Sequence, residues 1–252
     1  MKTNKTWTLA TILIAGILAG FLIGRIGFQT GQQIVKTPET REIKADAAKQ
    51  PSTPAESYLK PKIFETIANV SADDDPVMGS PDASLTVIEF TDYQCTFCRK
   101  YFLETFGSLK KDYIDTGKIK YVVRDYPLQE HPQALLAAEA ADCANEQGKF
   151  REMHDLLFTE QDKWSYQNDA LKTMKGFADQ LQLDQGKFSA CLDNGNSEME
   201  INKDISDGEL YKIAFTPTIF VGDKKIVGAQ AFETFKSVID SELNKLWQTQ
   251  EM

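Results

Sequence analysis

Hydrophobic and polar positions divide the chain into an apolar N-terminal stretch, a polar segment, and a long region that alternates strand and helix patterns. The run Leu85–Thr91 predicts a buried strand, and helical spacing of apolar residues follows from Cys95 to about Tyr113. A second strand is predicted from Lys118 to Arg124. This strand–helix–strand order predicts two parallel strands. Upstream, we expect a short element within Ile63–Val70 and a polar turn at Asp73–Pro76.

Residues 131 to about 213 switch to helical periodicity and predict an inserted helical subdomain. Three apolar stripes mark its core-facing sides: Phe150, Met153 and Leu157; Leu171, Met174, Ala178 and Leu181; and Phe188, Cys191 and Leu192. The chain then returns to strands at Thr218–Val221 and Lys225–Val227, which flank a glycine-containing turn and predict a hairpin. An amphipathic helix from Phe232 to Leu246 closes the chain. The order βαβ, helical insertion, ββα predicts an α/β fold.

The N-terminal stretch Trp7–Gly24 is uncharged and mostly apolar, and it follows Lys2 and Lys5. As a helix it would span roughly 27 Å, close to the thickness of a bilayer core. A cleaved signal peptide is the alternative, but the stretch is long for one and no cleavage motif follows it closely. We therefore expect a cytoplasmic N-terminus at 1–6 and a transmembrane signal-anchor at 7–28, with the remainder outside the cytoplasm.

The polar segment 29–62 is rich in Thr, Lys, Glu, Ala, Gln and Pro, and we expect a flexible linker. The folded domain is then predicted at 63–252. Gly16, Gly20 and Gly24 recur every four residues along the predicted membrane helix. Such a stripe would allow a homodimer through the transmembrane helix, although glycine is also common in membrane helices generally.

Composition narrows the function classes further. The chain has 252 residues and a net charge of −9, and no basic stripe follows any predicted element, so we expect no nucleic-acid partner. Its four cysteines are even in number and all lie on the predicted exported side, where disulfides persist.

The candidate chemistry lies in Cys95-Thr96-Phe97-Cys98, at the start of the first predicted helix. Free N–H groups and the helix dipole stabilise a thiolate there, and a second cysteine one turn further can resolve a mixed disulfide. A zinc site is the competing interpretation, but it needs a second ligand cluster, and Cys143 and Cys191 are far apart in the sequence. We therefore expect a redox dithiol, with no metal and no cofactor.

Three segments carry a resemblance to a known family. Val87–Cys98 (VIEFTDYQCTFC) resembles the active-site segment of DsbA-like thiol–disulfide oxidoreductases, and it is similar to the membrane-anchored or exported bacterial branch that includes BdbD-like proteins. Glu139–Phe150 is similar to the first insertion helices of that family, and Phe215–Gly222 resembles its cis-proline loop. The resemblance covers about Ile67 to Leu246. It implies a thioredoxin-like α/β fold with an inserted helical subdomain, here preceded by one N-terminal transmembrane helix.

Position and resemblance together assign roles to five residues. Cys95 is the expected nucleophile and Cys98 the less exposed resolving cysteine. Pro217 matches the family's cis-proline, and Thr216 matches the position that abuts the active-site sulfurs. Glu89 matches an acid that the family also carries; buried, it would have a raised pKa and relay a proton to or from Cys98, whereas at a strand edge it would be an ordinary carboxylate.

The remaining cysteines and histidines are expected to be structural. The resemblance implies a second cysteine pair in this branch, which would be Cys143 with Cys191; two buried free thiols are the alternative. His131 and His154 are expected to be packed or surface histidines rather than ligands. The uncharged dipeptide Thr96-Phe97 replaces the histidine-containing one of strong oxidants. We therefore expect the pKa of Cys95 to be below that of a free thiol, but less depressed than in those oxidants.

The leading functional hypothesis is an enzyme that donates the Cys95–Cys98 disulfide to exported, cysteine-containing proteins. The resemblance implies reoxidation by a membrane quinone-linked partner of the DsbB or VKOR-like type. A disulfide isomerase or reductase of the same fold is the first alternative, and a non-catalytic thioredoxin-fold chaperone is the second.

Overall fold

The computed structural model describes residues 62–65 and 70–250. The described elements, in chain order, are β1 (Lys62–Glu65), β2 (Val77–Gly79), β3 (Leu85–Thr91), α2 (Thr96–Tyr101), η1 (Phe102–Phe106), α3 (Gly107–Leu109), η2 (Lys110–Ile114), β4 (Ile119–Asp125), α4 (Ala134–Asn145), α5 (Phe150–Thr159), α6 (Gln161–Trp164), α7 (Ala170–Gln180), α8 (Gln185–Asn194), α9 (Asn196–Leu210), β5 (Thr218–Val221), β6 (Lys224–Val227) and α10 (Phe232–Gln250). The α/β class and the order of elements predicted from the sequence are confirmed.

A six-stranded mixed sheet forms the centre of the domain, with strand order β1-β6-β5-β3-β4-β2. The predicted parallel pair is β3 with β4, in which Glu89 lies opposite Val123. The predicted hairpin is β5 with β6, and its turn places Gly222 at φ 57°, a backbone conformation that glycine adopts without strain. The edge strand β2 was not predicted, because three residues with only Met78 buried give no periodic signal.

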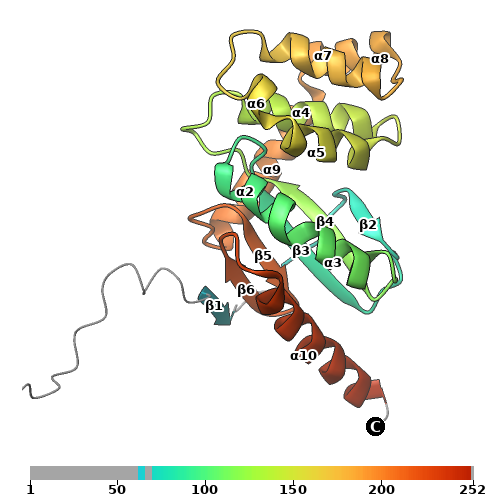
Figure 1. Cartoon of the computed structure of the whole chain (residues 1–252), viewed down its shortest axis with the longest axis vertical. Helices are drawn as coiled ribbons and strands as arrows, with labels where there is room; N and C mark the ends of the chain where they lie inside the picture. Colours follow the sequence, from blue (N-terminus) through green and yellow to red (C-terminus); the bar gives the residue numbers. More distant parts are fainter. Residues whose placement is uncertain (1–61, 66–69, 251–252) are drawn as a thin grey trace, which may run out of the picture. The chain divides into compact units, whose positions relative to one another are not determined.

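The predicted first helix is one continuous run from Thr96 to Ile114, in which α2 and α3 alternate with the π-helical segments η1 and η2. It packs with α10 over one face of the sheet, as Figure 1 shows. The larger buried cluster on this face includes Val87, Tyr101 and Tyr121. The opposite face carries Ile88 and Phe90 and is covered by Ile213 and neighbouring side chains.

Helices α4 to α9 form the predicted insertion between β4 and β5 (Figure 1). Its core contains Phe150, Met153 and Leu157, as the first stripe predicted. The second stripe was partly wrong, because Leu171 is 43% exposed and Phe177 fills the interior instead.

The predicted N-terminus 1–6, signal-anchor 7–28 and linker lie outside the described residues, apart from Lys62, which begins β1. Within 62–65 and 70–250, no helix combines the length and the apolar character needed to cross a membrane.

Candidate active site

The two cysteines of the motif lie at the start of α2, the helix that follows β3. Cys95 is the N-cap residue of α2, with extended backbone angles, and its carbonyl accepts from the N–H of Arg99 at 3.0 Å. Cys98 lies one turn further along and is fully buried, whereas Cys95 is 5% exposed. Both are free thiols. The arrangement directs the free N–H groups of the first helical turn toward Cys95.

The surroundings shift the pKa values of the two thiols in opposite directions. Hydrogen bonding from the Cys98 thiol lowers the pKa of Cys95 to about 6, with further help from Thr216 and the backbone N–H groups of Cys98 and Phe97, against an opposing effect of burial. Burial raises the pKa of Cys98 well above its usual value, and the neighbouring Cys95 and Glu89 add to this. At neutral pH one sulfur is therefore a thiolate and the other a thiol.

The loop before β5 approaches the first sulfur from a distant part of the chain. The Sγ atom of Cys95 lies 3.6 Å from the carbonyl oxygen of Thr216, and the Thr216–Pro217 peptide bond is cis. Thr216 is 4% exposed, and its Oγ1 has no hydrogen-bond partner among the described residues. The structure thus brings the predicted cis-proline loop against the predicted nucleophile.

Glu89 lies in the interior rather than at a strand edge. It is 2% exposed, and its Oε2 accepts a hydrogen bond from the Tyr121 hydroxyl at 2.5 Å, which in turn lies 3.1 Å from the Tyr101 hydroxyl. Its Oε1 has no hydrogen-bond partner within the described part of the chain. Burial raises the pKa of Glu89, which favours the protonated form of its carboxyl.

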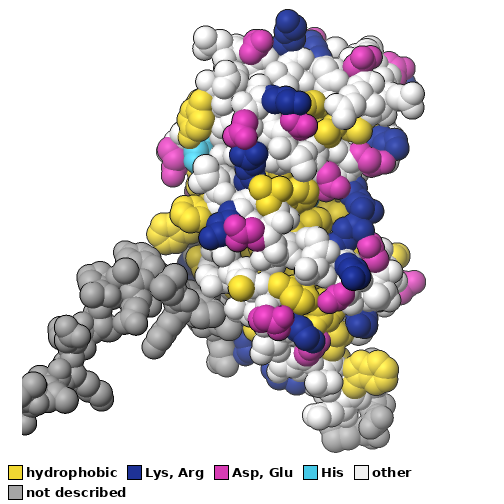
Figure 2. Space-filling model, in the orientation of Figure 1, with side chains coloured by type: hydrophobic (Ala, Val, Ile, Leu, Met, Phe, Trp, Pro, Cys, Tyr) yellow, Lys and Arg dark blue, Asp and Glu magenta, His cyan; other side chains and the backbone are white. Residues whose placement is uncertain are grey.

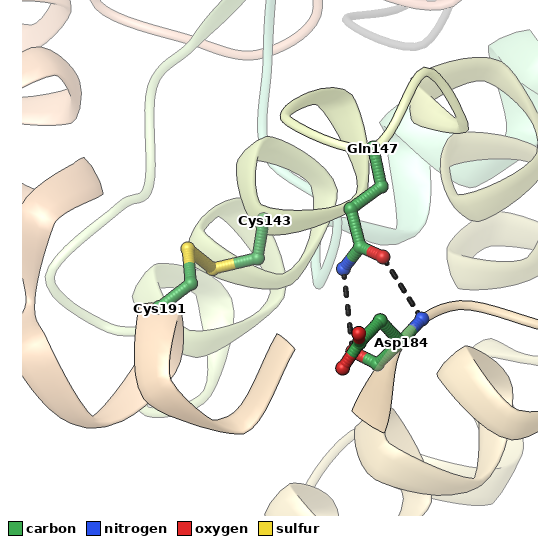
Figure 3. Close-up of a disulfide and its surroundings, with 4 residues drawn as sticks. All are labelled: Cys143, Gln147, Asp184 and Cys191. Atoms are coloured by element: carbon green, nitrogen blue, oxygen red, sulfur yellow. Dashed lines mark hydrogen bonds between the residues drawn. A yellow bond between two sulfur atoms is a disulfide. The ribbon is translucent and has the colours of Figure 1, made fainter. Parts of the chain in front are cut away.

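Cys143 and Cys191 form a disulfide that joins α4 to α8 (Figure 3). Beside it, the Gln147 side chain accepts from the N–H of Asp184 at 2.9 Å and donates to the Asp184 carbonyl at 3.5 Å. This pair of bonds braces the same two parts of the insertion. The disulfide belongs to the scaffold of the insertion and is separate from the Cys95–Cys98 motif.

Sequence reasoning missed Asp92. It is 1% exposed, its N–H donates to Cys98 Sγ at 3.5 Å, and its carboxylate accepts from the N–H of Cys95 at 3.1 Å. The carboxylate also lies 2.6 Å from Nδ1 of His131, which was expected to be only a packed or surface residue. An aspartate just before a predicted helix is a capping signal that could have pointed to Asp92. The contact with His131 depends on the fold and has no local signal.

A second polar cluster surrounds the side chain of Arg124 on β4. The fully buried guanidinium of Arg124 binds Asp75 at 2.9 Å and also contacts Asp204 and Asp207. Carboxylate oxygens of Asp75, Glu200 and Asp204 lie within 4.8 Å of one another. The Arg124 guanidinium is the cation that pairs with Asp75 and Asp204 in this cluster.

A thiolate–thiol pair at a helix start, facing a cis-proline loop in a thioredoxin-like fold with a helical insertion, defines the DsbA-like class of thioredoxin-fold proteins. The chain belongs to this family. The family model described as Thioredoxin matches residues 71–241. A Rickettsia conorii protein named as a candidate protein-disulfide oxidoreductase is 28% identical over 208 residues, which cover 82% of this chain and 72% of the relative.

Solved structures show the same likeness. Wolbachia pipientis alpha-DsbA1 superposes with a TM-score of 0.64 at 27% identity, covering 71% of this chain and 95% of that one. Oxidised BdbD from Bacillus subtilis gives 0.66 at 26% identity, covering 71% and 98%. The chain also matches the Na(+)/H(+) antiporter NhaA 1 of Salinispora arenicola at 32% identity over 180 residues, 71% of this chain, but it spans only 26% of that relative's length.

Proposed function

We propose that the protein is an extracytoplasmic thiol–disulfide oxidoreductase that introduces disulfides into exported proteins. The observation that carries the proposal is the pairing of an acidic Cys95 with a fully buried Cys98 beside the Thr216 carbonyl. In the overall exchange, a substrate dithiol becomes a disulfide while the Cys95–Cys98 disulfide becomes two thiols. Two electrons and two protons pass from the substrate to the protein.

The exchange has two steps at one sulfur. A substrate thiolate attacks Sγ of Cys95, the Cys95–Cys98 bond breaks, and Cys98 leaves as a thiolate. Because burial strongly disfavours that thiolate, it must take up a proton, and the protonated carboxyl of Glu89 can supply it. A second substrate thiolate then attacks the substrate sulfur of the mixed disulfide, and Cys95 departs as a stabilised thiolate.

The substrate is proposed to be an extended, cysteine-containing polypeptide. The Thr216 backbone beside Cys95 can pair with such a chain in the manner of an added strand. Phe97, inside the Cys95–Cys98 motif, and Phe215, directly before Thr216, are 61% and 66% exposed and offer apolar contacts to an unfolded chain. Figure 2 shows hydrophobic side chains exposed between charges of both signs on one face of the molecule.

The proposed location is the outer side of the cell membrane, with 7–28 as a single-pass anchor. The Cys143–Cys191 disulfide supports a compartment in which disulfides persist. A membrane quinone-linked protein of the DsbB or VKOR-like type would reoxidise the dithiol, and the stripe at Gly16, Gly20 and Gly24 would allow dimerisation. Membrane retention of the full chain after alkaline extraction, with release of a variant lacking residues 1–28, tests the anchor.

A reductase or isomerase of the same fold is the second candidate, because the dipeptide Thr96-Phe97 carries no charge to stabilise the thiolate. Equilibration of the Cys95–Cys98 pair with glutathione separates the directions. A potential of roughly −120 mV marks a strong oxidant and one of roughly −270 mV a reductant.

The activity is tested by mixing the oxidised protein with a reduced, unfolded substrate and titrating the remaining substrate thiols. An oxidase removes two substrate thiols per protein molecule, and C95S removes none. C98S cannot form the Cys95–Cys98 disulfide and should likewise remove none. If the wild type and C95S suppress aggregation equally and neither removes thiols, the protein is a chaperone and the proposal is wrong.

A further inference from the structure

One carboxylate connects the active-site helix to the first loop of the helical insertion. Oδ1 of Asp92 accepts from the N–H groups of Gln94 at 2.7 Å and Cys95 at 3.1 Å. Oδ2 accepts from the N–H of Leu128 at 2.8 Å and lies 2.6 Å from Nδ1 of His131. The Asp92 side chain is fully buried, and the His131 side chain is 15% exposed. Both carboxylate oxygens are therefore held, one by the helix start and one by the insertion.

The position of this carboxylate creates a conflict with the reactive sulfur. The N-terminus of a helix favours one negative charge, and both the Asp92 carboxylate and the Cys95 thiolate lie there. A like charge beside a thiol disfavours its ionisation. An unpaired Asp92 carboxylate would thus weaken the thiolate on which the proposed exchange depends.

The cations of the same helix do not resolve this conflict. Both terminal guanidinium nitrogens of Arg99 bind Asp162 at 2.8 Å, and Lys100 lies 3.9 Å from Glu104. Asp125 on β4 is another acid that interacts electrostatically with Asp92, and burial raises its pKa well above the usual value, which favours its neutral form. His131 is the side chain placed to balance Asp92 directly.

We propose that His131 is a positioning residue that shares one proton with Asp92, so that this pair carries no net charge beside the Cys95 thiolate. This inference rests on the proposed function. The neutral pair makes the Cys95–Cys98 disulfide more oxidising than the uncharged dipeptide Thr96-Phe97 alone would make it. The charge control comes from the loop that precedes α4 rather than from within the motif. Without His131, a negative charge on Asp92 would lie beside the start of α2 with only backbone N–H groups as partners.

The test compares H131N, D92N and the double variant in the reduced protein, by thiolate absorbance at 240 nm against pH and by equilibration with glutathione. H131N should lower the acid dissociation constant of Cys95 by about three- to tenfold, the size expected for one like charge nearby in a partly screened site. The equilibrium constant for oxidation of glutathione should fall in the same direction. D92N keeps an acceptor for the Cys95 N–H and should not lower the dissociation constant.

The H131N/D92N double variant distinguishes an effect of the His131 charge on Cys95 from an effect of altered structure. If the inference holds, adding H131N to D92N changes the Cys95 dissociation constant by less than about twofold. Q133A is the matched control, because Gln133 also ties the insertion to the site through Gln94, at 2.8 Å, but carries no charge; it should leave the dissociation constant unchanged. An unchanged constant in H131N, or an equal fall in the D92N background, overturns the inference.

The test remains decisive if H131N does not fold, and it is independent of the proposed function. If H131N fails to fold, the sign of the D92N effect decides the matter, and a fall in the Cys95 dissociation constant overturns the inference. The thiolate titration uses no substrate, so it is independent of the proposed function. A wild type that transfers no disulfide but still shows the His131 effect would refute only the function.

Discussion

The hydrogen bond from the buried Cys98 thiol is the largest contribution to the acidity of Cys95, and its removal gives a sharp prediction. In C98A the donor is lost, while the Thr216 loop and the backbone N–H groups remain. We expect the pKa of Cys95 to rise from about 6 toward the value of 9 for an ordinary thiol. C98S retains a hydroxyl donor at the same place and should give an intermediate pKa.

The size of the effect follows from linkage. The folded-state pKa of Cys95 lies below its unfolded value, so its contribution to the stability of the reduced protein is fully present above the unfolded pKa. That contribution is lost as the pH falls through about 6. At pH 7 it is roughly 1–2 kcal/mol, since only the part between the folded pKa and pH 7 counts. Stabilising the reduced form by this amount makes the disulfide roughly 30 mV more oxidising at pH 7.

The assay is the absorbance of the thiolate at 240 nm between pH 3 and 10, with C95S as the blank. The rate of alkylation by iodoacetamide gives an independent profile of the same group. The wild type should show a midpoint near pH 6, and C98A a midpoint at least one unit higher. If C98A keeps the wild-type midpoint, the helix N-terminus and the Thr216 loop stabilise the thiolate without Cys98, and the account of the site is wrong.

Three further changes test other parts of the structure. E89Q removes the proton donor for the departing Cys98 thiolate and should slow formation of the mixed disulfide from the Cys95–Cys98 disulfide at pH 7 by at least about tenfold, measured by rapid-mixing fluorescence; an unchanged rate would show that solvent supplies the proton. R124M leaves Asp75 and Asp204 without their buried cation and should lower the free energy of unfolding by roughly 3–5 kcal/mol in urea, and a loss below about 1 kcal/mol would contradict this. The double variant C143A/C191A opens a loop whose ends are 48 residues apart and should cost about 4 kcal/mol of stability; dithiothreitol should destabilise the wild type but not this variant, or the disulfide has no stabilising role.

Elements with a strong local pattern could be predicted from the sequence to within one or two residues. Leu85–Thr91 was predicted and observed with the same bounds, and the helix predicted from Cys95 to about Tyr113 is observed from Thr96 to Ile114. The face on which Glu89 lies could not be derived from alternation. Both faces of β3 are buried, so apolar residues fill successive positions on each side of the sheet.

The features that the sequence did not reveal are those made by long-range contacts. Arg124 looked like the polar end of a strand, but its side chain is fully buried because acids from residues near 75 and 204 meet it there. The pairing of Asp92 with His131 joins residues 39 positions apart. Each of these side chains is unremarkable in its own sequence neighbourhood. Only folding of the chain brings them together as buried charged pairs.

This distinction bears on how the chemistry of the motif should be judged. The two residues between the cysteines suggest a weak thiolate, since neither Thr96 nor Phe97 carries a charge. Yet the Cys95 sulfur is contacted by a carbonyl 121 positions away. The Asp92 carboxylate, which accepts from the N–H of Cys95, is also held by the insertion. The proposed proton sharing between Asp92 and His131 would control the charge beside Cys95 from outside the motif. The oxidising strength of such a protein is therefore a property of the assembled loops around the helix start, and variants outside the motif should change it.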